Sequence, residues 1–364
     1  MIKPILVASC AVVVLCGCDQ KSDAPEEKAP KEKAATKTPE KAAEPAGPKV
    51  GINLPGNDPK VVELAKKVLT CKFEKDFDSN CAEYKAWKDE SGLFADNKAD
   101  ATLVAFLEDT DEKVVALGIS KLRGWDGGAF ADKALAGRIL AVAEKSVKGK
   151  PALGEIVGHL KVKETETFPR IKALMANEEL GDIMRGDILY SLLRTNPDSD
   201  DVFALEKGLL DDARLGRSAF SGFTNYGDEK ACPVYLATLE NKDDYLSSRS
   251  AEQIASQPCK AQLDAMLKSI EGHLKAKKVT DIHYCDALTE TCKSKEASAA
   301  QKKKALGLSH KIAEDKTNKA PSVRGEALEA ALACDEKGGK KYLGKFLKDA
   351  DKDVAEKAAK LTAK

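Results

Sequence analysis

The chain has 364 residues, and its 59 lysines and arginines are balanced by 59 aspartates and glutamates. A net charge of zero argues against the basic surface that a nucleic-acid-binding protein needs, so we expect no nucleic-acid partner. Aromatic residues make up only 5% of the chain, whereas charged residues make up 32%. This composition is typical of a helical protein whose outer faces are solvated.

The N-terminus carries a short apolar segment that begins soon after Lys3. The 14 residues from Ile5 to Cys18 are too few for a membrane-spanning helix, which needs roughly 20, but they match the hydrophobic region of a signal peptide. The last four, Leu15-Cys16-Gly17-Cys18, resemble the lipobox of bacterial lipoproteins. The resemblance implies that residues 1–17 are removed and that Cys18 is lipidated.

A lipidated Cys18 would place the protein in the bacterial cell envelope, bound to a membrane through its lipid and facing the periplasm or the cell exterior. Two other interpretations stay open. Cys10 follows Val7-Ala8-Ser9 and is a second formal lipobox candidate, although almost no hydrophobic sequence precedes it. The segment also fits an ordinary secretory signal.

Residues 18–59 are expected to form the lipidated N-terminus and a disordered tether. From Asp19 onwards the segment is rich in Lys, Glu, Ala and Pro, with no aromatic residue and no branched aliphatic residue before Val50. Such a segment cannot bury enough apolar surface to offset the entropy lost on ordering. Its Lys and Glu nearly balance, so it is not a polybasic membrane patch. We expect a spacer that holds the folded part away from the membrane.

The rest of the chain has the pattern of an all-α protein. Apolar residues recur at helical spacing in pairs of short segments, as in residues 100–109 and the segment that begins at Glu112 after an acidic turn. The second segment of several pairs carries an arginine followed by a small residue. Arg185, Arg217 and Arg249 lie 32 positions apart, and Arg324 occupies a similar place later in the chain. A period of 30–40 residues is typical of stacked helical hairpins.

This pattern resembles HEAT-type repeats, whose hairpins stack into an α-solenoid. The resemblance implies about eight hairpins over residues 95–364, with residues 260–320 fitting the register least well. An irregular helical bundle is the alternative. Residues 60–94 are expected to form a helical cap that shields the first apolar face, because they combine an apolar helix stripe with an aromatic cluster of Phe73, Phe77, Tyr84 and Trp87.

Seven cysteines follow Cys18, and an extracytoplasmic protein is expected to join most of them in disulfides. Cys71 and Cys81 flank a short loop between two predicted cap helices, so we pair them. Cys232 and Cys259 lie at adjoining ends of one predicted antiparallel hairpin, so we pair them as well.

The remaining cysteines leave alternatives open. Cys285 and Cys292 cannot bridge along one intact helix, because seven residues rise about 10 Å and the two Cα atoms must lie within about 7 Å. Either that helix breaks between them, or Cys292 pairs with Cys334. Because seven is odd, at least one thiol is free or pairs between molecules.

The sequence predicts no catalytic site, no cofactor and no metal site. It contains no P-loop, no dinucleotide fingerprint and no Gly-x-Ser-x-Gly elbow. The spacing of His283, Cys285 and Cys292 does not match a zinc pattern such as paired Cys-x-x-Cys. His283 beside Cys285 is more simply an accidental neighbour than a catalytic pair.

The recurring arginines have two interpretations. Arg185, Arg217, Arg249 and Arg324 line a concave binding groove, or, as we favour, they bond to the acidic turns of their own repeats. We therefore expect a non-catalytic, lipid-anchored scaffold that binds an unidentified envelope protein. The alternatives are a glycan- or peptide-binding lipoprotein, and a metal- or redox-dependent sensor or enzyme that uses the cysteine-rich residues 283–334.

Overall fold

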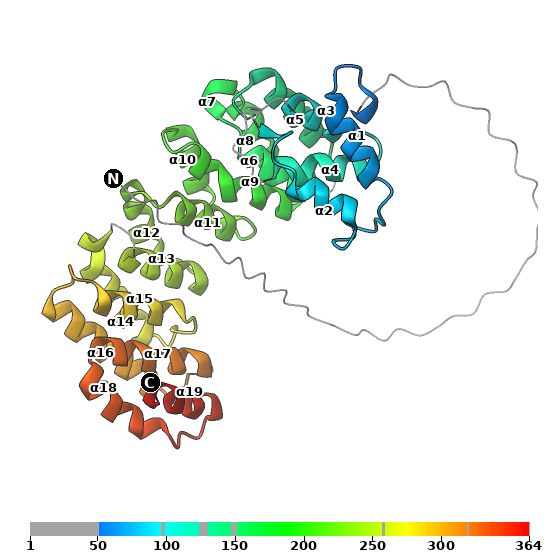
Figure 1. Cartoon of the computed structure of the whole chain (residues 1–364). Coiled ribbons are helices and arrows are strands. Elements are labelled where there is room, and N and C mark those ends of the chain that lie inside the picture. Colours follow the sequence, from blue (N-terminus) through cyan, green and yellow to red (C-terminus); the bar gives the residue numbers. More distant parts are fainter. Residues whose placement is uncertain are drawn as a thin grey trace, which may run out of the picture. The chain divides into compact units, whose positions relative to one another are not determined.

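The computed structural model describes residues 51–95, 99–123, 130–146, 151–256, 259–318 and 320–363. These residues belong to one compact unit and form nineteen α-helices with short 3-10 turns between them (Figure 1). Within the described residues there is no β-strand, and Phe73 and Phe77 form a single isolated bridge. The all-α prediction is thus confirmed. Cys18 and the predicted tether up to residue 50 lie outside the described residues.

Most helices occur in pairs along the chain. The first members are α3 (Asp100–Leu107), α5 (Lys133–Lys145), α8 (Phe168–Ala176), α10 (Asp200–Gly208), α12 (Cys232–Thr238), α14 (Leu263–Lys275), α16 (Ala299–Glu314) and α18 (Glu336–Leu343). The second members are α4 (Glu112–Leu122), α6 (Pro151–Gly158), α9 (Asp182–Thr195), α11 (Gly216–Tyr226), α13 (Asp244–Ser256), α15 (His283–Lys293), α17 (Pro321–Cys334) and α19 (Lys352–Thr362). The short α7 (Val162–Thr165) lies between α6 and α8.

Capping residues in the sequence explain where many of these helices begin. Asp111, Asp132 and Asp351 precede α4, α5 and α19, and each side chain accepts hydrogen bonds from backbone N–H groups in the first turn. Ser298 and Gln301 form a reciprocal capping box at the start of α16. Such caps satisfy donors that the helix itself leaves unpaired. The acidic turns of the sequence therefore act as helix starts.

The second helices pack against one another in chain order. α6 contacts α9, α9 contacts α11, α11 contacts α13, α13 contacts α15, α15 contacts α17, and α17 contacts α19. Glycines allow α9 to lie close to both neighbours. A Cβ on Gly154 of α6 would lie 2.3 Å from the carbonyl oxygen of Met184, and a Cβ on Gly222 of α11 would lie 2.7 Å from that of Leu189. Any larger residue there would push the helices apart.

The N-terminal part folds from Gly51 onwards, earlier than the expected end of the tether at residue 59. The 3-10 turn η1 (Gly51–Asn53) contacts α3, and the backbone N–H of Ile52 donates to Asp109 at 2.8 Å. The Ile52 side chain is buried and belongs to the hydrophobic core.

The predicted cap region contains α1 (Pro59–Val68) and α2 (Ala82–Asp89). Trp87 is fully buried between the rings of Phe94 and Phe106, with centroid distances of 5.1 and 6.4 Å, and its indole N–H donates to Ser120 at 2.9 Å. The aromatic residues therefore attach the first helices to the α3–α4 pair.

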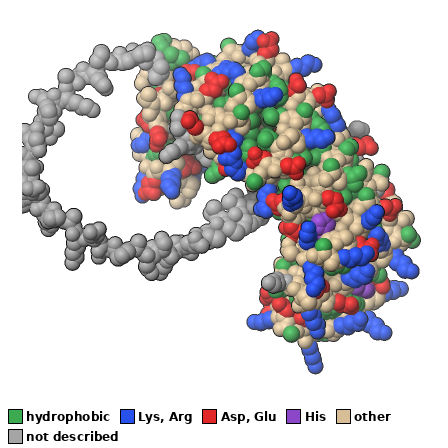
Figure 2. All heavy atoms as spheres, turned by 180° about the vertical axis from the view of Figure 1, so that it is seen from behind, with side chains coloured by type: hydrophobic (Ala, Val, Ile, Leu, Met, Phe, Trp, Pro, Cys, Tyr) green, Lys and Arg blue, Asp and Glu red, His purple; other side chains and the backbone are tan. Residues whose placement is uncertain are grey.

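The region that fitted the predicted register least well consists mainly of helices joined by short turns in its described part. Residues 263–275, 283–293 and 299–314 form α14, α15 and α16, and α14 contacts α16. Among the described residues, none of the helices is long and apolar enough to cross a membrane. Charged side chains of both signs are spread over the face seen in Figure 2.

Candidate functional site

Two of the four arginines that the sequence singled out are buried. Arg185 donates from Nη1 to the carbonyl of Met175 at 3.1 Å and from Nη2 to Asp182 at 2.5 Å. Arg324 donates to the carbonyl of Ala313 and to both carboxylate oxygens of Asp349. Each guanidinium thus bonds to the C-terminal end of the preceding helix and to a nearby acid. Neither is available to a ligand.

The other two arginines lie nearer the surface. Arg217 donates to Asp243 at 2.8 and 3.1 Å, and its guanidinium lies 4.8 Å from the centre of the Tyr245 ring. Arg249 is partly buried and bonds to Glu252. All four arginines therefore have partners within the chain. Because Arg185 and Arg324 are buried, the four arginines do not line one binding groove.

Helix register explains why equal spacing gives unequal surroundings. Arg185 and Arg324 are each the fourth residue of their helices, α9 and α17, whereas Arg217 is the second residue of α11 and Arg249 the sixth of α13. Each position along a helix turns the side chain by about 100°. A spacing of 32 in the sequence therefore does not place these side chains at equivalent positions.

A second cluster joins α13 to α15 and centres on His283. Its Nδ1 lies 3.1 Å from Glu252 and 3.1 Å from Asp286, while Arg249 shares Glu252 and lies 3.5 Å from the same nitrogen. Burial alone would lower the pKa of His283, but hydrogen bonds to Asp286 and Glu252 and the charge of Glu252 raise it to about 9. At neutral pH the imidazole is therefore a cation that links two carboxylates across the helix interface.

The same cluster has the geometry of three metal ligands. One ligand atom each from Glu252, His283 and Asp286 lies within 4.8 Å of the others. A metal would have to displace the proton of His283 and approach the guanidinium of Arg249. Two cations already balance the two carboxylates, so the arrangement as it stands is better suited to holding the helices together than to binding a cation.

A buried polar network beneath this cluster was missed by the sequence analysis. The Tyr284 hydroxyl donates to Asp244 at 2.9 Å and contacts the Ser247 hydroxyl at 3.1 Å, and Ser247 lies 3.2 Å from His273 Nε2. His273 also lies 3.0 Å from the carbonyl of Leu239. Serine beside histidine resembles a nucleophile and its base, but Ser247 is fully buried and no substrate reaches it.

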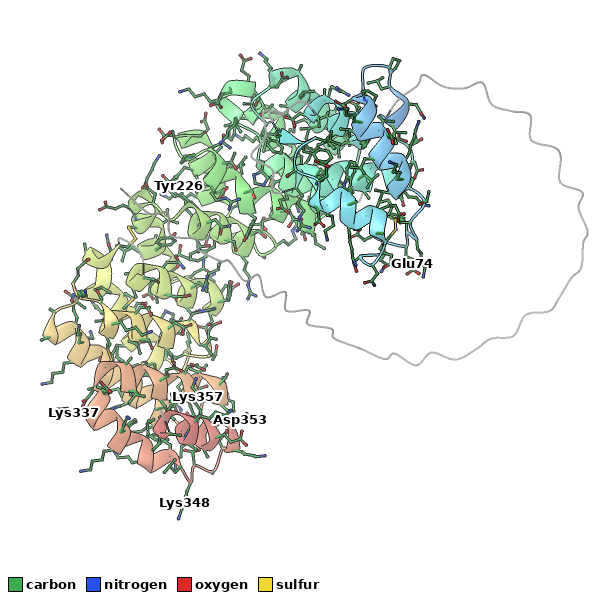
Figure 3. The ribbon with its side chains drawn as sticks, in the orientation of Figure 1. Glu74, Tyr226, Lys337, Lys348, Asp353 and Lys357 are labelled. Atoms are coloured by element: carbon green, nitrogen blue, oxygen red, sulfur yellow. A yellow bond between two sulfur atoms is a disulfide. The ribbon has the colours of Figure 1, made fainter. Side chains whose placement is uncertain are left out.

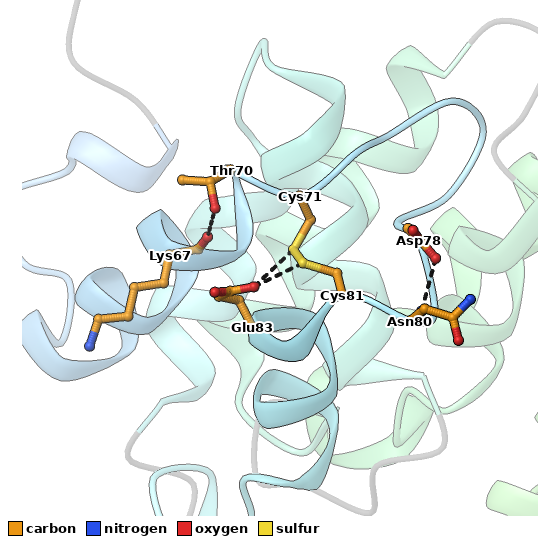
Figure 4. Close-up of a disulfide and its surroundings, with 7 residues drawn as sticks. All are labelled: Lys67, Thr70, Cys71, Asp78, Asn80, Cys81 and Glu83. Carbon is orange, nitrogen blue, oxygen red and sulfur yellow. Dashed lines mark hydrogen bonds between the residues drawn. A yellow bond between two sulfur atoms is a disulfide. The ribbon is translucent and has the colours of Figure 1, made fainter.

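The structure contains three disulfides among the described residues, and they join the two pairs that the sequence predicted and one pair that it left as an alternative. Cys71 bonds to Cys81, Cys232 to Cys259, and Cys292 to Cys334. Figure 4 shows the first, with the Glu83 carboxylate 3.0 Å from Cys81 Sγ. α15 is unbroken through residues 283–293, which explains why Cys292 bonds across to α17.

Cys285 is the free cysteine of the described residues. Its side chain is buried and its thiol contacts the carbonyl of Val323 at 3.4 Å. Burial raises the pKa of this thiol well above its usual range. A protonated, buried thiol is a poor nucleophile, so Cys285 and His283 do not form a catalytic pair.

The most exposed large apolar side chains lie on α9. Ile183 is 70% exposed and Tyr190 is 49% exposed, two helical turns further along. Asp187 lies between them, and burial together with the nearby charge of Glu155 raises its pKa to about 6. The amide of Asn225 on α11 donates to the carbonyl of Tyr190 at 2.9 Å, so α11 runs beside this face. We call Ile183, Asp187 and Tyr190 the α9 face.

Ion pairs link successive second helices on the same side. Arg123 at the end of α4 bonds to Glu155 of α6 at 2.5 Å. At the other end of the unit, Lys357 of α19 bonds to Glu326 and Glu329 of α17 at 2.9 and 2.7 Å (Figure 3). The partners lie 32 positions apart at Arg123 and Glu155, and Lys357 lies 31 and 28 positions from its two glutamates.

A hollow of about 620 Å³ lies beside α7, where Lys161, Phe168, Asn196 and Asp200 are among its lining residues. None of the four arginines lines it. No family model, no curated protein and no solved structure matches this chain.

Proposed function

We propose that this protein is a non-catalytic scaffold of the bacterial cell envelope, anchored by lipid at Cys18 and binding an envelope protein through the α9 face. In this proposal residues 95–364 form an α-solenoid of about eight HEAT-like hairpins behind the cap of residues 60–94. The tether that precedes them lets the solenoid sample proteins near the membrane.

The offset between hydrogen-bonded residues supports a repeated unit. Bonds between neighbouring helical pairs join residues 32 apart at Arg123 and Glu155, 35 apart at Asn225 and Tyr190, and 32 apart at Tyr342 and His310. In the region of weakest register the offset grows to 37 at Gln301 and Asp264 and to 40 at Tyr284 and Asp244. A nearly constant offset is expected when each hairpin packs on the next.

The disulfides support the proposed extracytoplasmic location. Three disulfides in one chain indicate an oxidising, extracytoplasmic environment, because cytosolic thiols are kept reduced. The lipobox resemblance of residues 15–18 adds the anchor.

The proposed binding role rests on the exposure of Ile183 and Tyr190. An isoleucine that is 70% exposed on a rigid helix gains by being covered, and tyrosine is among the residues that contribute most to protein interfaces. None of Ile183, Asp187 and Tyr190 lines the described hollow beside α7, and an exposed face of apolar and polar residues suits a folded protein better than a small molecule.

Crosslinking in cells tests this proposal. The full chain and an Ile183→Asp, Tyr190→Ser variant are crosslinked, purified by an affinity tag and analysed by mass spectrometry. Leu236→Asp is the matched control, because Leu236 is also an exposed apolar residue, at 39%, on α12. We expect a defined set of envelope proteins to be lost in the α9 variant and retained in the control.

The anchor is tested in the same experiment by Cys18→Ala. We expect the variant to leave the membrane fraction and to lose the same set of proteins. Equal recovery of these proteins from all variants would contradict the proposal. Metal bound in stoichiometric amount to the purified chain would instead favour the sensor alternative, with Glu252, His283 and Asp286 as its ligands.

A further inference from the structure

The C-terminal end of the described unit carries a group of exposed lysines, which we call the lysine face. α18 and the turn that follows it supply five lysines in residues 336–348, where Glu336 is the only acidic residue. α16 lies beside α18, since the rings of His310 and Tyr342 stack at 3.8 Å. Figure 2 shows basic side chains gathered at this end. The members of the lysine face are Lys303, Lys311, Lys337, Lys340, Lys341, Lys345 and Lys348.

These lysines form almost no ion pairs within the described chain. Lys345 lies 4.0 Å from Glu314, and no ion pair is formed by the other six. The nearby Asp349 is buried and bonded to Arg324, so its charge is already balanced. By contrast, Lys357 of α19, which is labelled in Figure 3, forms ion pairs with two glutamates. Figure 3 also shows Lys337 and Lys348 extending away from the fold.

An exposed apolar residue lies within the lysine face. Leu347 is 44% exposed, between Lys345 and Lys348 in the sequence. Its neighbour Phe346 is buried and packs on Tyr342 at 5.2 Å, which fixes the turn from which Leu347 projects. Lysines around a projecting leucine are the combination expected of a segment that lies at a bilayer interface.

We propose that the lysine face docks on an anionic phospholipid bilayer, with the ammonium groups at the lipid phosphates and Leu347 inserted among the headgroups. This inference rests on the proposed membrane anchor but does not follow from it. A tethered chain needs no second contact with the membrane. If it has one, the tether makes docking intramolecular, and the two attachments strengthen each other.

The character of the lysine face favours a bilayer over other polyanions. Tyr342 and Phe346 are buried, so no aromatic ring is offered for stacking on nucleic-acid bases. Six lysines without partners keep flexible stems, which suits the fluid array of phosphates on a membrane better than the fixed charges of a folded acidic protein. Leu347 adds an apolar contact that a soluble polyanion cannot use.

Vesicle co-sedimentation tests the proposal with the full chain. The vesicles are phosphatidylcholine alone, or an equimolar mixture of phosphatidylcholine and phosphatidylglycerol. Because each lysine near an anionic surface contributes roughly a fivefold gain in partitioning, Lys340→Gln, Lys341→Gln and Lys348→Gln together are expected to lower binding to the mixed vesicles about 100-fold. Lys60→Gln, Lys66→Gln and Lys85→Gln remove the same charge from exposed lysines of the cap and should leave binding unchanged.

Leu347→Ser separates the apolar contribution from the charge. It is expected to weaken binding to the mixed vesicles several-fold while leaving its salt dependence as in the unchanged chain. The apolar N-terminus is present in every variant, so differences between variants report on the lysine face alone.

Three results would overturn the proposal. The first is equal loss of binding in the cap control, and the second is binding that does not depend on phosphatidylglycerol. The third is full competition by soluble polyphosphate together with no effect of Leu347→Ser, which would identify a site for soluble polyanions. None of these bears on Cys18, so lysine-face docking can fail while the anchored scaffold stands. Loss of membrane association in Cys18→Ala tests the anchor separately.

Discussion

The guanidinium of Arg324 donates to both carboxylate oxygens of Asp349, at 3.2 and 2.7 Å, and both side chains are buried. A third bond runs from Arg324 Nε to the carbonyl of Ala313 at 3.0 Å. One side chain thus joins the end of α16, the start of α17 and the turn before α19. Hydrogen bonding to Arg324 lowers the pKa of Asp349, although its burial acts in the opposite direction.

Removing one partner of this pair should be costly. We expect Arg324→Ala to lower the free energy of unfolding by about 3–5 kcal/mol, because it leaves the Asp349 carboxylate buried without a counter-charge. Arg324→Met combined with Asp349→Leu should recover most of the loss, since it removes both charges. Urea unfolding followed by circular dichroism measures both variants. A double variant no more stable than Arg324→Ala would contradict this account.

The Arg324–Asp349 pair also makes the free energy of unfolding depend on pH in the acid range. The pKa of Asp349 is depressed in the folded state, so its contribution is present above the unfolded pKa and is lost as pH falls through the folded value. The double variant lacks this titration. Its unfolding free energy should therefore fall less than that of the unchanged chain when the pH is lowered below 4.

The sequence alone predicted the helical class and two of the disulfide pairs, Cys71–Cys81 and Cys232–Cys259, because both depend on local spacing. Asp-capped starts and apolar periodicity define α4 and α19 without knowledge of any neighbour. The Cys292–Cys334 pair was reachable once an intact α15 excluded Cys285. The helix starts and the first two disulfides require only the geometry of one helix or one hairpin, whereas Cys292–Cys334 joins two successive helical pairs.

The surroundings of individual side chains were not predictable in the same way. Arg185 and Arg217 share a spacing and a flanking small residue, yet one is buried and the other exposed. Their difference depends on which residue starts each helix, and sequence patterns locate such starts only to within a few positions. Glu252, which completes the His283 cluster, comes from a different helix, and no spacing rule in the sequence pairs them.

The His283 cluster predicts a dependence of stability on alkaline pH. The pKa of His283 is raised to about 9 in the folded state, so its contribution is complete below pH 6.5 and is lost as the pH rises through 9. The shift corresponds to at most about 3 kcal/mol. We expect His283→Gln to be less stable than the unchanged chain at pH 6.5 and to approach it above pH 9.

His310→Gln is the matched control for this measurement. The pKa of His310 is lowered, mainly by burial, so its titration cannot produce a loss of stability near pH 9. Urea midpoints across the alkaline range distinguish the two variants. A His283→Gln chain that still loses the same stability as the pH rises would show that another group is responsible.

Glu206 should destabilise the protein when it ionises. It is fully buried on α10, its Oε1 accepts from the backbone N–H of Leu193 at 3.1 Å, and its Oε2 has no hydrogen-bond partner. Burial raises the pKa of this carboxyl well above its usual range. With a raised folded pKa, stability is highest below the unfolded pKa and falls as pH rises. Glu206→Gln keeps the acceptor without the charge, so it should be more stable than the unchanged chain at pH 8 and lose this advantage near pH 4.

The Cys292–Cys334 and Cys71–Cys81 disulfides should stabilise different parts of the fold. Loop entropy predicts that Cys292→Ser with Cys334→Ser costs about 4 kcal/mol, because that bond spans 42 positions. Cys71→Ser with Cys81→Ser should cost about 3 kcal/mol, for a span of 10. Amide hydrogen exchange should show lost protection in α15 and α17 for the first variant and in α1 and α2 for the second. Loss spread over the whole unit in both cases would contradict these separate roles.

A thiol count connects the folded unit to processing at the N-terminus. The chain has ten cysteines, and six are joined in disulfides, which leaves Cys285 and the three cysteines of the N-terminal segment. Removal of residues 1–17 and acylation of Cys18 would leave Cys285 alone. If Cys18 is processed in this way, the protein purified from its native source and unfolded without reductant should react with a thiol reagent at one position, and the native protein at none because Cys285 is buried. Additional reactive thiols in the unfolded protein would mean that Cys18 is not acylated or that the segment before it is retained.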